Sequence, residues 1–185
     1  PIQNIDVFAL VKENNPILKK KTEYFDFQNP PTNANELASM LVETCKHHNG
    51  FGLAAPQCGL EYRVFVMGAN DEYVAFFNPK ILSSSLDTSI LAEGCLSFPM
   101  LALKIERPST IEVEYQDFNG VTRTGTFSGL SSHVFQHELD HLNGVCYTDR
   151  AKPVALKIGI KKRKKFNNLV DRYNKAQNKV KSITT

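Results

Sequence analysis

A His-Glu-x-x-His sequence is the stretch of this chain whose residue types and spacing are best suited to chemistry. It reads His137-Glu138-Leu139-Asp140-His141 and lies in the second half of the 185 residues. On an α-helix, residues four apart lie on one face, so His137 and His141 can direct imidazole nitrogens at one metal ion. Glu138 then lies beside the ion, where its carboxylate can accept a proton from a metal-bound water. The spacing therefore predicts a hydrolytic metal site on a helix.

A third metal ligand has to be found elsewhere in the chain. A catalytic tetrahedral centre takes three protein ligands and leaves one position open. No histidine follows His141 and no glutamate follows Glu138, so the downstream ligands of metzincins and of thermolysin-like enzymes are missing. The third ligand is therefore expected upstream.

Two upstream segments contain small residues and one potential ligand. Residues 50–57 read Gly-Phe-Gly-Leu-Ala-Ala-Pro-Gln, and residues 93–97 read Glu-Gly-Cys-Leu-Ser. Glycine lets a backbone approach a ligand closely, and a cysteine thiolate is a soft metal ligand. Taken alone, the first segment would be interpreted as a tight connector and Cys95 as a small buried apolar residue.

Together with residues 136–141, these two segments resemble the three motifs of the peptide deformylase family, in the same order and with similar spacing. The resemblance covers about residues 10–155. It implies that Cys95, His137 and His141 bind one divalent metal ion per chain. It also implies that this ion is Fe²⁺ in cells and that Zn²⁺, Ni²⁺ or Co²⁺ can replace it. It also implies the activity, which is hydrolysis of the formyl group from N-formyl-Met nascent peptides with release of formate.

The resemblance further assigns roles to single residues. Glu138 is expected to carry the proton from water to the departing amine. The Gln57 side-chain amide and the Leu96 backbone N–H are expected to donate hydrogen bonds to the tetrahedral oxyanion. The expected substrate-binding residues, which line the peptide strand and the methionine pocket, are Gly50, Phe51, Gly52, Leu91, Glu93, Gly94, Arg107, Leu130, His133 and Val134.

Two of these residues leave alternatives open. His133 replaces the aliphatic residue usual in the family and precedes His137 by one helical turn. It is either a fourth ligand that closes the site or a pocket wall, and the wall is favoured because hydrolysis needs an open position. Arg107 is either a residue of the peptide cleft or an ordinary charge at a strand end. Asp140 is expected to brace the ligands indirectly.

Charge is unevenly distributed along the chain. Of the 22 Lys and Arg residues 12 lie in residues 150–185, together with only one of the 19 acidic residues. That tail carries a net charge of +11 and residues 1–149 carry −8, within a total of +3. A basic helix suits the anionic RNA of a ribosome, although a charge run can also be merely solvated. The ribosome is thus a hypothetical partner, and no membrane or DNA partner is expected.

The length of the chain favours one domain, with residues 1–155 as the catalytic part and residues 156–185 as a basic C-terminal helix of the same domain. No apolar run reaches membrane-spanning length and no signal pattern opens the chain. A cytoplasmic protein is expected, or an organellar or host-cell one if the source is not bacterial.

The four cysteines form no CxxC pair, which argues against a disulfide framework.

The elements that must position these residues follow from periodicity and turn signals. Helices are expected at about residues 33–48, with Asn33 as cap and Gly50 as closing residue, at about 129–142 with Ser128 as cap, and from Pro153 onward. Strands are expected at residues 62–67, 73–78, 80–84, 111–115, 122–127 and 146–147. This order predicts an α+β fold with mixed or antiparallel sheets around a central His-Glu-x-x-His helix, and with a C-terminal helix.

Two other functions fit the same residues. One is a metallopeptidase that cleaves amide bonds other than the formyl amide, which an assay on formylated, acetylated and unblocked peptides would distinguish. The other is a non-catalytic RNA-binding or ribosome-associated module with a purely structural metal. An open coordination position beside Glu138 argues against that second alternative.

Overall fold

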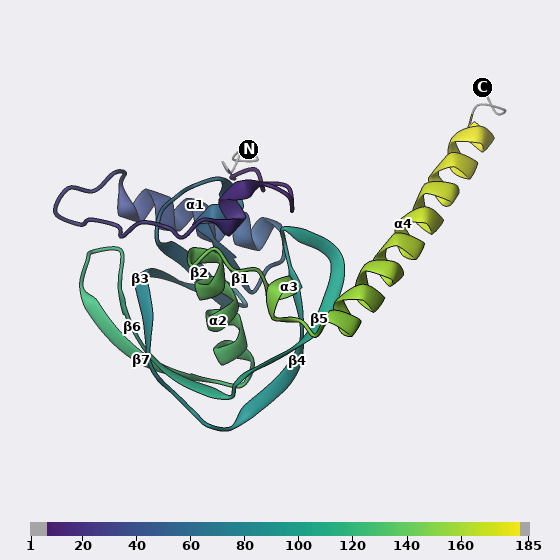
Figure 1. Ribbon diagram of the computed structural model, residues 1–185. Coiled ribbons are helices and arrows are strands. Elements are labelled where there is room, and N and C mark those ends of the chain that lie inside the picture. The colour runs from purple at the N-terminus through teal and green to yellow at the C-terminus, as the bar shows by residue number, and fades with distance from the viewer. Residues whose placement is uncertain (1–6, 182–185) are drawn as a thin grey trace.

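The computed structural model describes the backbone of residues 7–181 and the side chains of residues 7–177. The sequence analysis divided the chain into residues 1–155 and 156–185. The first six and last four of these residues, 1–6 and 182–185, lie outside the described backbone. A body of two sheets and several helices carries one long helix that projects away from it (Figure 1). The α+β class predicted from the sequence is confirmed.

A five-stranded antiparallel sheet forms most of the body, with the strand order β1-β2-β3-β6-β7. Its strands are β1 (Gly52–Ala54), β2 (Val64–Ala69), β3 (Glu72–Ser84), β6 (Thr110–Gln116) and β7 (Thr122–Ser128). The two strands predicted at residues 73–78 and 80–84 are one strand, β3. Asn78 there has a φ of 50°, and the register with β6 shifts between Phe77 and Lys80. Asn78-Pro79 therefore marks a bulge rather than a turn, because Pro79 has no N–H for the ladder.

Two further strands, β4 (Thr88–Cys95) and β5 (Phe98–Pro108), pair as a separate antiparallel sheet. No strand was predicted over β5. The sequence does contain a strand signal there, which is the spacing of Leu101, Leu103 and Ile105 at every second position. In the structure these three residues are buried, while the residues between them are exposed. That period of two is typical of a strand with one covered face.

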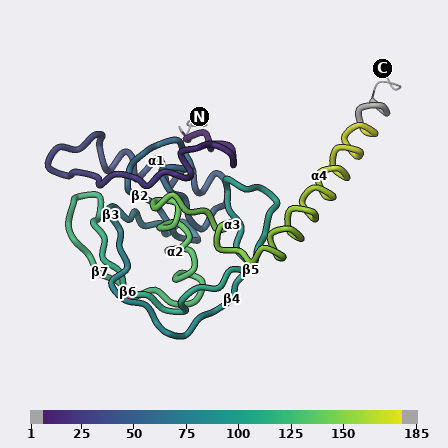
Figure 2. The backbone as a smooth tube through the Cα atoms, in the orientation of Figure 1, coloured from purple at the N-terminus to yellow at the C-terminus, as the bar shows by residue number. Residues whose placement is uncertain are grey.

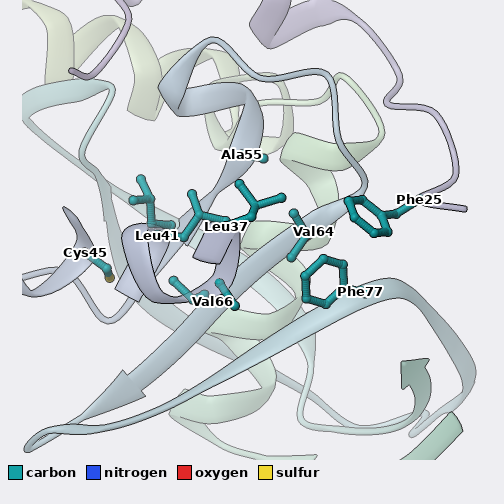
Figure 3. Close-up of a cluster of buried hydrophobic side chains, with 10 residues drawn as sticks. Phe25, Leu37, Leu41, Cys45, Ala55, Val64, Val66 and Phe77 are labelled. Atoms are coloured by element: carbon teal, nitrogen blue, oxygen red, sulfur yellow. The ribbon is translucent and has the colours of Figure 1, made fainter. Parts of the chain in front are cut away.

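Helices α1 (Ala34–His47) and α2 (Leu130–Leu142) cover opposite faces of the five-stranded sheet. Figure 3 shows the core on the α1 side, where Leu37, Leu41 and Cys45 meet Val64 and Val66. Alternate residues of β2 point to the other face, where an aromatic cluster packs under α2 and contains Phe65, Phe76, Phe127 and Phe135. Because α2 is covered on several sides, ten of its thirteen residues are buried.

The predicted helix ends are partly correct. Asn33 caps α1 as expected, with Oδ1 accepting hydrogen bonds from the backbone N–H groups of residues 35 and 36. The left-handed residue after α1 is Asn49, with φ 53°, rather than Gly50. The predicted cap of α2, Ser128, is wrong, because its backbone is still paired in β7 and Gly129 begins the helix without a side-chain cap.

The C-terminal part contains two helices, α3 (Tyr147–Arg150) and α4 (Pro153–Lys181). The strand predicted at residues 146–147 is wrong. Asp149 accepts a hydrogen bond from the Cys146 N–H at 2.9 Å and so starts α3, while the Tyr147 hydroxyl donates to the Leu101 carbonyl at 2.7 Å. Two short 3-10 helices, η1 (Pro16–Lys19) and η2 (Ala55–Cys58), complete the elements.

Helix α4 begins at Pro153, where the sequence predicted its start, and Pro153 occupies its first turn as expected. Gly159 lies against β5, where an added Cβ would be 2.8 Å from Leu103 Cδ2. Arg163 then forms an ion pair with Glu13 at 2.7 Å. Beyond that point every residue from 164 to 177 is exposed, and the tube in Figure 2 follows this segment away from the body. None of the described helices combines the length and the apolar character needed to cross a membrane.

Candidate active site

Three potential metal ligands meet between β4 and α2. Cys95 is the last residue of β4, and His137 and His141 lie one turn apart on α2. One ligand atom from each residue lies within 4.8 Å of the other two. The Cys95 Sγ is 3.3 Å from His141 Nε2, and the two imidazole ring centres are 5.0 Å apart. The structure thus brings together the three residues that the sequence analysis expected to share one ion.

Glu93 orients His137 from behind. Its Oε2 accepts a hydrogen bond from His137 Nδ1 at 3.0 Å, while Arg107 donates from Nε to Oε1 at 2.6 Å and from its terminal nitrogen to Oε2 at 2.9 Å. Burial alone would raise the pKa of Glu93, but the hydrogen bonds from Arg107 and His137 outweigh it and hold that pKa well below 4.5. Since an ionised carboxylate only accepts, the His137 hydrogen is on Nδ1 and Nε2 is free to face the cluster.

Arg107 and Asp140 extend this buried network away from the cavity. The Arg107 side chain is 2% exposed and also donates to Asp140 Oδ2 at 2.8 Å. Asp140 in turn accepts hydrogen bonds from Arg150. Arg107 is therefore neither at the peptide cleft nor an exposed strand-end charge. Asp140 is linked to the ligand His137 through two intervening residues, Arg107 and Glu93, so it braces that ligand indirectly.

The pKa values of the two imidazoles shift in opposite directions because the two rings have different neighbours. Burial would lower the pKa of His137, but its contacts with Cys95 and Glu93 raise it to about 10. Burial, and then the neighbouring His137, lower the pKa of His141 well below 6.5. A cation at the cluster would therefore be stabilised by the thiol and carboxylate groups that hold a proton on His137.

Glu138 is buried without a full set of hydrogen bonds. Its side chain lines the cavity, and within the described part of the chain Oε2 has no partner; the same holds for His141 Nδ1. Burial raises the pKa of Glu138 from 4.5 to about 7, because the charged form loses its hydration. A thiolate and two imidazoles, next to a carboxylate oxygen that lacks a partner, fit a divalent metal that keeps one position for a small polar ligand.

Gln57 points its amide nitrogen at the same cluster. Its Oε1 accepts from the Ala54 N–H at 2.8 Å, and its Nε2 lies 3.4 Å from Cys95 Sγ and 3.2 Å from Ser97 Oγ. The backbone bond to Ala54 fixes which end of the amide faces the site. Ser97 was not among the predicted site residues, although it belongs to the Glu-Gly-Cys-Leu-Ser segment. Leu96, between Cys95 and Ser97, lines the cavity.

A cavity of about 580 Å³ opens over the cluster. Its lining includes every predicted site residue except His141 and Arg107. One wall is β1, which is an edge strand of the five-stranded sheet and so leaves its outer side unpaired. The cavity also has lining residues that the sequence analysis did not name, because they carry no ligand or motif pattern: Leu10, His48, Asn49, Ala92, Pro99 and Met100.

His133 lies in the cavity wall and is not part of the metal-ligand group. Its Nδ1 is 3.0 Å from Glu93 Oε1 and its Nε2 is 3.0 Å from Ser89 Oγ. Both nitrogens are therefore engaged away from Cys95. This geometry supports the pocket wall over the fourth ligand.

Comparison with known proteins gives one consistent family. The family model described as polypeptide deformylase matches residues 7–157. A peptide deformylase of Thermotoga neapolitana is 41% identical over 152 residues, which cover 80% of this chain and 88% of the relative. The crystal structure of peptide deformylase from Thermotoga maritima is similar with a TM-score of 0.73 and 38% identity, over 80% of this chain and 99% of that one. A class I type b peptide deformylase from Acinetobacter baumannii, solved with Met-Ala-Ser bound, has a TM-score of 0.74 and 29% identity, over 78% of this chain and 98% of that one.

Proposed function

The chain belongs to the polypeptide deformylase family, and on that premise we propose that Cys95, His137 and His141 hold its metal ion and that Glu138 moves the proton. The enzyme is a metal-dependent hydrolase that removes the N-formyl group from N-formylmethionyl peptides and releases formate. The observation that carries the assignment of residues is the meeting of three ligand atoms within 4.8 Å, beside a cavity that Cys95 and His137 line.

The bound metal would supply Lewis acidity, polarising the formyl carbonyl and making an adjacent water more acidic. Glu138 accepts the proton of that water and passes it to the departing amine. In the metal-free protein burial raises the pKa of Glu138, which favours a carboxylate that can hold a proton. Among the described residues Glu138 Oε2 has no hydrogen-bond partner, so it can take the proton without breaking an existing hydrogen bond.

Gln57 and Leu96 are proposed to stabilise the oxyanion. The Gln57 amide is held by Ala54, so its N–H group is directed at the cluster before substrate arrives. Such preorganised donors stabilise developing charge without reorganisation. The Leu96 backbone N–H is the second proposed donor.

The peptide is proposed to bind as an added strand on the open edge of β1, along Gly50, Phe51 and Gly52. The Gly50 carbonyl accepts hydrogen bonds from Tyr73 Oη at 2.7 Å and Cys45 Sγ at 3.2 Å, and Phe51 O accepts from the Gly68 N–H. Gly52 is consequently the residue best placed to pair with a peptide. The methionine side chain is proposed to be enclosed by Leu130, His133 and Val134, with Phe51 and Leu91 opposite. Glu93 and Gly94 are proposed to complete the substrate-binding wall.

The metal is proposed to be ferrous iron, as the resemblance to the family implies. A thiolate with two imidazoles also accepts Zn²⁺, Ni²⁺ or Co²⁺. Because the substrates are nascent chains, we place the enzyme in the compartment where they emerge, the cytoplasm of its own cell or of a host. Residues 156–185 are proposed to belong to the same domain as residues 1–155.

Helix α4 is proposed to dock on the ribosome. Its residues 161–165 are all basic, and residues 164–177 are exposed on all sides, as expected of a helix that has a partner outside its own chain. The test is binding to ribosomes across a salt series for the full chain and for a form ending at Arg163, which keeps the Gly159 and Glu13 contacts. Weaker and less salt-dependent binding by the short form is expected. Equal binding by both forms would refute the docking role.

The function is tested on protein purified without oxygen. Metal content and formate release are measured with formyl-Met-Ala-Ser, acetyl-Met-Ala-Ser and Met-Ala-Ser. One metal per chain and turnover of the formylated peptide alone are expected. Cys95→Ser should lose the metal and the activity, whereas Cys58→Ser, which changes a cysteine outside the cluster, should keep both. Full metal content in Cys95→Ser would remove Cys95 from the ligand set.

A further inference from the structure

His133 and His137 share one carboxylate. Glu93 Oε1 accepts hydrogen bonds from His133 Nδ1 at 3.0 Å and Arg107 Nε at 2.6 Å. Glu93 Oε2 accepts from His137 Nδ1 at 3.0 Å and from an Arg107 terminal nitrogen at 2.9 Å. A carboxylate has about four acceptor positions. All of them are filled, and two are filled by imidazoles one helical turn apart.

The second nitrogen of His133 is also occupied. Ser89 Oγ lies 3.0 Å from His133 Nε2, so the imidazole is held at both ends between β4 and Glu93. The His133 side chain is only 2% exposed. The ring therefore has a single orientation, and the Nδ1 hydrogen is directed at Glu93, which can only accept.

We propose that His133 is a positioning residue for the metal centre, which fixes Glu93 so that this carboxylate holds His137 with Nε2 toward Cys95. The proposal rests on the proposed function, because it takes Cys95, His137 and His141 as the ligands. Without His133 the carboxylate would keep Arg107 but would have one empty acceptor position in a buried site. The Glu93 plane could then turn, and the His137 ring would turn with it.

Ser89, His133 and Glu93 have the order of hydrogen bonds found in nucleophilic serine sites. Ser89 does not line the cavity, however, so a substrate held there could not reach its hydroxyl. The role that remains for the trio is to transmit orientation to His137, and Ser89 serves as the outer anchor.

Two isosteric variants separate this role from simple packing. His133→Asn places an amide N–H near the former Nδ1 and can still donate to Glu93. His133→Gln places its amide near the former Nε2 and can reach Ser89 but not Glu93. His47→Leu, which changes an exposed histidine outside the cavity, is the control.

The main measurement is Co²⁺ affinity, by competition with a chromophoric chelator, together with the visible spectrum of the Co²⁺ protein. Outer partners of metal-bound histidines change metal affinity by about tenfold or more. His133→Gln should therefore weaken Co²⁺ binding by about tenfold and shift the spectrum, whereas His133→Asn should stay within about threefold of the parent.

Equal Co²⁺ affinities and spectra for both variants and the parent would overturn the positioning role. So would equal losses in both variants, since the ring rather than its bond to Glu93 would then matter. Failure of the underlying function gives a different result: Cys95→Ser would then leave Co²⁺ affinity and spectrum unchanged in the parent background.

Discussion

Gly52 lies against Glu138 so closely that a Cβ on the glycine would be 2.5 Å from Glu138 Oε1 and 2.8 Å from its Cδ. Real Cβ atoms essentially never approach heavy atoms to that distance. Strand β1 is therefore in direct contact with the carboxylate of Glu138. The edge of this strand is proposed to bind the peptide, and the carboxylate is proposed to move the proton. The absence of a side chain at residue 52 decides where Glu138 can lie.

The first prediction follows from that contact. Gly52→Ala should push the Glu138 carboxylate aside and lower kcat by about 100-fold, because small misplacements of catalytic groups are costly. Metal content should not change. Gly125→Ala is the matched control, since an added Cβ on that strand glycine meets nothing closer than 3.8 Å. Steady-state kinetics with formyl-Met-Ala-Ser decide the matter, and parent-like kcat in Gly52→Ala would contradict the contact.

The second prediction concerns pH and the burial of Glu138. Its pKa is raised from 4.5 to about 7 in the folded protein, so between these values the folded state binds more protons than the unfolded state. Stability of the metal-free protein should therefore fall as pH rises through that window. Glu138→Gln removes this term, and the stability difference between the two proteins should change by on the order of 3 kcal/mol. Urea unfolding in the presence of a chelator at several pH values measures it.

The same Glu138→Gln protein gives a kinetic result. Turnover should fall by about 10²- to 10⁴-fold, since proton transfer by a positioned side chain contributes that much. The metal should stay bound, because Glu138 is outside the ligand group. A pH-independent stability difference together with undiminished turnover would remove Glu138 from the mechanism.

The third prediction separates a buried structural role of Arg107 from a role in the peptide cleft. Arg107→Ala leaves Glu93 and Asp140 buried without their shared cation and should cost about 3–5 kcal/mol of stability. Arg107→Lys should recover only part of it, because an ammonium cannot bind two carboxylates in a fork. Arg123→Ala, which breaks the exposed pair with Asp117, should cost less than about 1 kcal/mol.

Kinetics on the folded Arg107→Lys protein complete that test. KM for the formylated peptide should be unchanged, since Arg107 does not line the cavity. A raised KM with parent-like stability would instead support the peptide-cleft alternative.

The fourth prediction concerns the donor end of Gln57. Gln57→Glu keeps an oxygen that can accept from the Ala54 N–H but replaces the nitrogen near Cys95. If that nitrogen stabilises the oxyanion, kcat should fall by about 10²- to 10³-fold with a smaller change in KM. Metal content is measured in parallel, because the new carboxylate lies close to Cys95. Unchanged kcat at full metal content would rule out the oxyanion role.

Local chemistry explains what could be predicted about the fold. The helix at residues 33–48 was identified from its apolar spacing and from Asn33, and it is present as α1. The strands predicted at residues 111–115 and 122–127 are present as the antiparallel pair of β6 and β7. In both cases the signal depends on residues a few positions apart. The strand predicted at Cys146-Tyr147 failed because Asp149 caps a helix there, while a distant hydrogen bond to Leu101 fixes the Tyr147 side chain.

By itself the sequence determined the residue types that can do chemistry: two imidazoles one helical turn apart, a carboxylate beside them, and motifs that resemble a deformylase. Only the tertiary structure decided the partners of the buried charges. Glu93 serves His133 and His137 because β4 runs beside α2, and Arg107 reaches Glu93 because β5 pairs with β4. No periodicity encodes such pairings, since a buried charge is stabilised by whichever opposite charge a distant strand or helix brings within hydrogen-bond distance.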